Sequence, residues 1–232
     1  IKGQYVKKII LFLALSIEKK EKTQTLVLGA GCFWGVEKYF ENLEGVKEAT
    51  SGYAGGSYTN PTYETVLKYK NSQKDIINHN EVVKIVYDDT KISTLKLIKS
   101  FWELHNPTQG NRQGNDRGNN YRSAIYYESN AQKDIALETK EVYQKLLTKA
   151  GYGEITTEIK PLDVFYPAET YHQDYLKKNP SGYCPNHATG VKFDNEKTIV
   201  DVITPLKGKE IIVIDALNCV FCEKFKVNVT DH

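Results

Sequence analysis

Residues 25–40 read TLVLGAGCFWGVEKYF, a stretch that combines a strand, a glycine turn and the start of a helix. Residues 25–28 favour a strand, and residues 29–31 turn the chain. From Cys32 onward, apolar residues recur at helical spacing. Cys32 is therefore predicted to lie near a helix N-terminus, where backbone N–H groups stabilise a thiolate and lower the thiol pKa. Taken alone, a cysteine beside a glycine turn is more often a small buried residue.

Strand and helix patterns alternate along the chain as far as residue 165. Further strands are predicted at 46–52, 81–87, 121–127 and 155–165, and helices at 94–105 and 131–150. Mixed elements in this order predict a two-layer α/β domain. After His172 the sequence is polar and rich in turn residues, which predicts a long coil. Coil histidines such as His172 and His187 are expected at the surface.

The composition is that of a globular protein, with 40% hydrophobic and 26% charged residues in a chain of 232. The net charge is only +2, from 31 basic and 29 acidic residues, which argues against nucleic acid as a partner. The sequence has no phosphate-binding loop, dinucleotide fingerprint or HExxH motif. No cofactor is therefore predicted, and no metal is assigned to the main site.

Residues 1–22 are expected to lie outside the folded domain. Three lysines and the apolar run 9–15 resemble a secretory signal, followed by a charged linker. The apolar run is too short to span a bilayer, and no clear cleavage site follows it. The segment is a signal, retained or cleaved, or an amphipathic arm. A membrane contact is expected only if it is retained, and the location is cytoplasmic or, with a signal, periplasmic or secreted.

The motif GCFWG at 31–35 resembles the signature of A-type peptide methionine sulfoxide reductases. Further motifs match that family in the same order: GYAGG (52–56), NPTY (60–63), HNEV (79–82), NP (106–107), QGNDRG (113–118), YRS (121–123), YHQDYL (171–176) and NPSGYC (179–184). The resemblance implies reduction of methionine S-sulfoxide, free or in proteins. We expect an α+β fold, a two-layer α/β plait with a ferredoxin-like core and a long C-terminal coil, over residues 23–195.

The resemblance also implies roles for individual residues. Cys32 matches the family's nucleophile, which becomes a sulfenic acid as methionine is released. Glu81 matches the acid, which must hold its proton near neutral pH through burial. The remaining matches are two phenols that bind the sulfoxide oxygen, a polar residue that arranges the site, and an apolar pocket for the substrate methyl group: Tyr63, Tyr121, Asp116, Phe33 and Trp34. The segment between Tyr63 and Glu81 looks several residues longer than in the family.

The remaining cysteines concern recycling. Cys184 matches a resolving cysteine, which forms a disulfide with Cys32 that thioredoxin or a similar dithiol reduces. Residues 196–232 form an extension in which Cys219 and Cys222 make a CxxC motif, and this segment resembles part of a thioredoxin-like domain. The pair is a redox relay, an inert remnant, or, with Cys184 and His187, a zinc ligand set. An alternative function is thiol–disulfide exchange through Cys219 and Cys222.

Overall fold

A computed structural model of the chain describes residues 22–72, 76–184 and 187–193. A six-stranded sheet lies at its centre, with the strand order β7-β6-β1-β3-β2-β8. Neighbouring strands are antiparallel, except that β6 and β7 are parallel. Its strands are β1 (Thr23–Ala30), β2 (Val46–Ala54), β3 (Asn80–Asp88), β6 (Ser123–Tyr127), β7 (Glu158–Pro161) and β8 (Phe165–Pro167). The predicted α+β class is confirmed.

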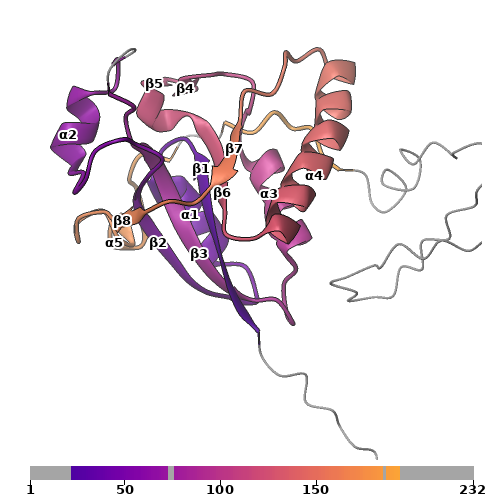
Figure 1. The fold of residues 1–232 in the computed structure, drawn as a ribbon, viewed down its shortest axis with the longest axis horizontal. Coiled ribbons are helices and arrows are strands. Elements are labelled where there is room, and N and C mark those ends of the chain that lie inside the picture. Colours follow the sequence, from indigo (N-terminus) through magenta and orange to yellow (C-terminus); the bar gives the residue numbers. More distant parts are fainter. Residues whose placement is uncertain (1–21, 73–75, 185–186, 194–232) are drawn as a thin grey trace, which may run out of the picture.

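Helices and a small hairpin complete the domain (Figure 1). The hairpin consists of β4 (Arg112–Gln113) and β5 (Asp116–Arg117). The helices are α1 (Phe33–Glu41), α2 (Tyr63–Lys68), α3 (Thr94–Leu104), α4 (Asn130–Lys149), α5 (Tyr175–Lys178) and the 3-10 helix η1 (Asn119–Tyr121). The helices predicted around residues 32–40, 94–105 and 131–150 are confirmed as α1, α3 and α4.

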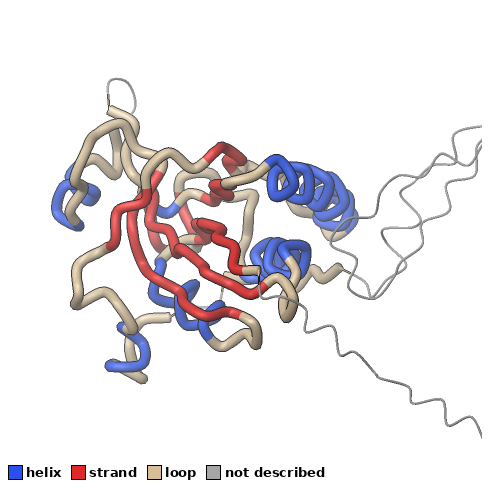
Figure 2. Tube along the Cα trace, turned by 60° about the horizontal axis from the view of Figure 1, so that its bottom comes forward, coloured by secondary structure: helices blue, strands red, loops and turns tan. Residues whose placement is uncertain are grey.

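The main core lies between one face of the sheet and helices α1, α3 and α4. Strand residues alternate between faces, so Leu26 and Leu28 join this core while Val27 faces the other side. Helices α3 and α4 lie side by side (Figure 1, Figure 2), and the Trp102 indole N–H donates to Thr139 Oγ1 at 2.8 Å between them. The apolar residues that recur along each of these two helices lie on its buried face.

The second face of the sheet carries a smaller apolar cluster, which Leu162 and Phe165 help to cover. Both residues belong to the stretch 155–165, and the prediction of one strand there is wrong. β7 pairs with β6 at one edge of the sheet, whereas β8 pairs with β2 at the opposite edge. The chain leaves the first edge after Pro161, which has no N–H to continue the ladder.

Candidate active site

The residues with predicted chemistry gather at one end of the sheet, where β1 and β2 end and β3 and β6 begin. Antiparallel pairing produces this meeting, because Ala30 at the end of β1 lies opposite Ser123 at the start of β6. In the same way, Ala54 at the end of β2 lies opposite Asn80 at the start of β3. Residues that are far apart in the sequence are thereby brought close to the N-terminus of α1.

Cys32 lies directly before the first residue of α1, as predicted. The preceding Gly31 has a φ of +94°, and a side chain there would meet Gln113 Cγ at 2.7 Å. Cys32 is partly exposed and forms no disulfide with another described residue. Burial and the nearby Glu81 carboxyl raise its pKa, and the backbone N–H of Trp34 lowers it by less. The predicted fall in pKa is therefore wrong, because lost hydration outweighs the helix N-terminus.

Glu81 is the second residue of β3, and only 2% of its surface is exposed. The backbone N–H of Phe33 donates to its Oε2 at 3.4 Å, and Asn120 Nδ2 donates to its Oε1 at 3.1 Å. Burial raises the pKa of this carboxyl to about 8, although both hydrogen bonds oppose the rise. The side chain is therefore an acid that keeps its proton at neutral pH, next to the residue that follows Cys32.

The two predicted phenols approach the same point from separate segments. Tyr63 begins α2 and Tyr121 ends η1. Burial raises the pKa of Tyr63 to about 12, and both Glu81 and Cys32 lie near enough to add to the rise. Burial also raises the pKa of Tyr121, with further contributions from Glu81 and Tyr63. Both phenols therefore stay protonated and can donate a hydrogen bond to an oxygen atom bound between them.

Asp116, the first residue of β5, lies on the side of the site that faces the C-terminal coil. Its Oδ1 accepts a hydrogen bond from the Tyr183 phenol at 3.3 Å. Its Oδ2 is buried and has no hydrogen-bond partner among the residues that the structure describes. Burial raises the pKa of this carboxyl, while Tyr183 and His187 act in the opposite direction. One oxygen thus remains available to a polar group that enters the site.

An aromatic wall continues from Cys32 into the first turn of α1. Phe33 is buried, and its ring centroid lies 5.9 Å from that of Tyr53 and 4.9 Å from that of His172. Trp34 is partly exposed and stacks on Tyr175, with ring centroids 3.7 Å apart. These rings form a rigid apolar surface next to the thiol, suited to a small apolar group.

His172 was expected at the surface, and this expectation is wrong because only 1% of the residue is exposed. Its Nδ1 accepts a hydrogen bond from the Trp34 indole N–H at 3.1 Å. Its Nε2 lies 3.9 Å from Glu169, whose other oxygen accepts the backbone N–H of Tyr63 at 2.8 Å. Burial lowers the pKa of this imidazole, with Glu169 opposing the change. The neutral histidine therefore fixes the plane of Trp34.

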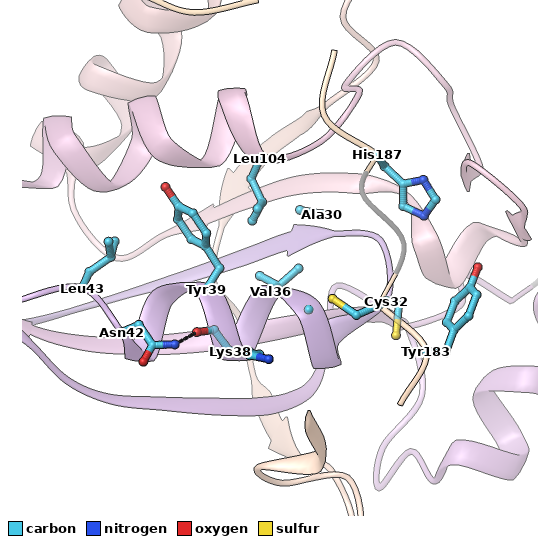
Figure 3. A pocket seen from close by; sticks show the side chains of 12 residues that line it. Ala30, Cys32, Val36, Lys38, Tyr39, Asn42, Leu43, Leu104, Tyr183 and His187 are labelled. Atoms are coloured by element: carbon cyan, nitrogen blue, oxygen red, sulfur yellow. Dashed lines mark hydrogen bonds between the residues drawn. The ribbon is translucent and has the colours of Figure 1, made fainter. Parts of the chain in front are cut away.

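Cys184 is exposed, and its sulfur lies next to Gly35 in the first turn of α1. Together with Cys32, Tyr183 and His187 it lines a largely apolar cavity of about 560 Å³, which runs along α1 towards Tyr39 and Leu43. Figure 3 shows Cys32 at one end of this cavity, with Tyr183 and His187 beside it. The structure therefore brings Cys184 to the helix that begins after Cys32.

Cys219 and Cys222 lie outside the described residues, so their predicted roles stay predictions. Within residues 22–72, 76–184 and 187–193, no group of three or more His, Cys, Asp or Glu side chains could hold a metal ion. The zinc hypothesis needs two ligands from beyond these ranges.

Sequence reasoning overlooked Asn120 and Glu169, which orient Glu81 and Tyr63. Asn120 lies between the motifs at 113–118 and 121–123, so its position in the sequence could have indicated a role in the site. Glu169 gives no such signal, because Tyr53 and Tyr63, from which it accepts hydrogen bonds, lie more than 100 residues away in the sequence.

Comparison with known proteins adds independent evidence about this site. The sequence profile of peptide methionine sulfoxide reductases matches residues 24–201. The chain belongs to the peptide methionine sulfoxide reductase family. It is 47% identical over 186 residues to the peptide methionine sulfoxide reductase MsrA of Vibrio cholerae, covering 80% of this chain and 85% of that protein. It is 52% identical over 171 residues to the mitochondrial peptide methionine sulfoxide reductase of Rattus norvegicus, covering 74% and 71%.

The fold agrees with this assignment. The structure of methionine sulfoxide reductase A of Corynebacterium diphtheriae is similar to it, with a TM-score of 0.65 and 46% identity over 73% of this chain and 81% of that one. The resemblance inferred from the motifs is confirmed, and the protein is a peptide-methionine (S)-S-oxide reductase of the A type. In the part of the reductase that the structure describes, no helix is long and apolar enough to cross a bilayer.

Proposed function

We propose that this reductase uses the Cys32 sulfur as the nucleophile towards the sulfoxide and Glu81 as the proton donor. The contact between the Glu81 carboxyl and the backbone N–H of Phe33 carries the proposal. It holds an acid with a pKa of about 8 against the start of the helix that follows Cys32. An oxygen that leaves sulfur needs a proton, and a neutral carboxylic acid supplies one at physiological pH.

The first step converts the Cys32 thiol and the sulfoxide into a sulfenic acid and a thioether. The sulfur of Cys32 loses two electrons and the sulfoxide sulfur gains them, so no external reductant takes part. A bound sulfoxide also presents a partly positive sulfur atom to Cys32. This charge favours the thiolate, which the empty site disfavours through burial. Substrate binding therefore activates the nucleophile.

Binding of the substrate is assigned to the surrounding groups. The phenols of Tyr63 and Tyr121 donate hydrogen bonds to the sulfoxide oxygen, in the position where negative charge grows. Phe33 and Trp34 receive the methyl group, because a methyl attached to sulfur gains from contact with aromatic rings. Asp116 offers its free Oδ2 to a polar group of the substrate. The proposed substrates are free methionine sulfoxide and methionine sulfoxide in oxidised proteins.

Recycling is assigned to Cys184. Its thiol attacks the Cys32 sulfenic acid, water leaves, and the resulting disulfide is reduced by thioredoxin or a similar dithiol. The exposure of Cys184 and its place beside Cys32 in one cavity support this role. Cys219 and Cys222 would then pass electrons between the reductant and this disulfide, as part of an extension over residues 196–232.

We also propose that the catalytic domain, residues 23–195, is a ferredoxin-like plait. The strand order β6-β1-β3-β2, with α1 between β1 and β2 and α3 between β3 and β6, supports it. In this topology β1 and β3 are central neighbours, so the residues at their adjoining ends are held by two partner strands each. Cys32 comes shortly after the end of β1, and Glu81 is the second residue of β3.

The test uses the variant Cys184→Ser with an excess of the S-sulfoxide. The variant should release about one methionine per protein and then stop, because the first step needs only Cys32 and Glu81. A sulfenic-acid trapping reagent should then label Cys32, detected by mass spectrometry of the peptide. Labelling at another cysteine, or methionine release without any labelled thiol, would contradict the proposal.

A further inference from the structure

Gly35 lies one helical turn after Cys32, on the same face of α1. A methyl group at position 35 would lie 3.2 Å from Cys184 Sγ, closer than ordinary van der Waals contact. Gly35 is inside the helix and does not have a positive φ, so the local backbone does not demand glycine. The feature that a side chain here would disturb is the sulfur of Cys184.

Two contacts hold the C-terminal coil on either side of Cys184. The Tyr183 phenol donates to Asp116 Oδ1 at 3.3 Å. The His187 ring lies against Gly114, where a Cβ atom would come within 2.1 Å of Cε1 and where φ is +59°. Both contacts reach the β4–β5 hairpin. Cys184 thus lies between two residues that contact the hairpin, and its sulfur lies next to Gly35 of α1.

We propose that Gly35 is a positioning residue for the second step of the reaction, because it leaves room for the Cys184 sulfur beside Cys32. This inference rests on the resolving role proposed for Cys184. In that step a bond forms between the two sulfurs, the S–O bond of the sulfenic acid breaks, and the oxygen leaves as water with the thiol proton. A disulfide brings its two Cβ atoms to within about 3.5–4.5 Å, so a displaced coil slows the attack.

The test compares Gly35→Ala and Gly35→Leu with the parent in a single turnover with one equivalent of S-sulfoxide. Methionine release and formation of the Cys32–Cys184 disulfide are both followed by rapid quench and mass spectrometry. The alanine methyl requires the Cys184 sulfur to move by a few tenths of an ångström, and the longer leucine side chain requires more. Because a displacement of 1 Å can cost a reaction about 10²-fold, we expect disulfide formation about tenfold slower in the alanine variant and about 100-fold slower in the leucine variant. Methionine release should keep the parent's rate, and the sulfenic acid should accumulate.

The matched control is Gly153→Ala, the same substitution at a glycine where, its chain neighbours aside, no described atom lies within 4 Å of the added carbon. This control should form the disulfide at the parent's rate. Parent-like disulfide formation in both Gly35 variants would overturn the inference. So would an equal slowing of methionine release, since Gly35 would then support Cys32 or the helix. If the parent itself forms no Cys32–Cys184 disulfide, the resolving role of Cys184 fails first.

Discussion

Replacing Glu81 with glutamine is expected to make the enzyme slower and the fold more stable. In the unfolded chain this carboxyl ionises near its ordinary pKa of 4.5, whereas burial raises the pKa in the folded protein to about 8. Between these values the unfolded chain has released the proton and the folded protein has kept it. The free energy of unfolding therefore falls as the pH rises from 4.5 to 8 and is level above that range.

The size of this effect follows from the two pKa values. At about 1.4 kcal/mol per pKa unit, the carboxyl lowers the free energy of unfolding by about 3 kcal/mol at pH 7. Glutamine does not titrate and avoids this loss. Its amide nitrogen cannot accept the hydrogen bond from the backbone N–H of Phe33, and this loss lowers the free energy of unfolding of the variant by about 1 kcal/mol. The net gain expected for Glu81→Gln at pH 7 is about 2 kcal/mol.

Urea unfolding of the parent and the variant near pH 5, 7 and 9 measures this gain. The stability difference should grow between the first two conditions, whereas methionine release should be roughly 10²–10⁴-fold slower in the variant. The rate profile of the parent should also change slope near pH 8, where Glu81 titrates, and that of the variant should not. Glu37→Gln is the control, because it alters another buried carboxyl that binds the backbone N–H groups of Ser51 and Asp174.

The Glu37 control should keep the change of slope near pH 8. A stability difference between Glu81→Gln and the parent that does not vary with pH would refute the assignment of a neutral buried acid. Parent-like methionine release in Glu81→Gln would remove the side chain from proton donation.

Three other variants test two groups of the site and the CxxC pair. His172→Phe removes the acceptor of the Trp34 indole N–H, so the KM for the sulfoxide should rise about tenfold with a smaller change in kcat, as steady-state kinetics would reveal. Tyr121→Phe should slow methionine release about tenfold through loss of one donor to the oxygen, and an unchanged single-turnover rate would exclude that donor. The double variant Cys219→Ser/Cys222→Ser should form the internal disulfide normally and recycle more slowly with thioredoxin. Recycling at the parent's rate would exclude the redox relay and leave Cys219 and Cys222 as an inert remnant or as zinc ligands.

The fold was predictable where burial follows a simple period. β1, α1, α3 and α4 each present one apolar face to a single core, and their sequences show that face directly. The stretch 155–165 is different because its two strands pair with opposite edges of the sheet. A strand pattern indicates that a segment favours the extended conformation, but it does not indicate which strand the segment will pair with.

The sequence allowed the residues of the candidate site to be predicted, but not the direction of the pKa shift of Cys32. The position of Cys32 before a helix follows from the glycine turn, but its raised pKa comes from burial and from Glu81, 49 residues away. The burial of His172 could not be predicted from its own segment, because the rings of Phe33, Trp34 and Tyr63 that pack around it belong to other elements. Long-range packing of this kind has no signature in one sequence.

Cys32 is the sulfur that attacks the sulfoxide in the proposed mechanism. The most direct measurement is methionine release in a single turnover by Cys32→Ser, with the fold checked by circular dichroism. A hydroxyl cannot replace the sulfur nucleophile, so we expect a loss of several orders of magnitude in a variant that remains folded. Release of methionine at a rate near that of the parent would contradict the mechanism at its first step.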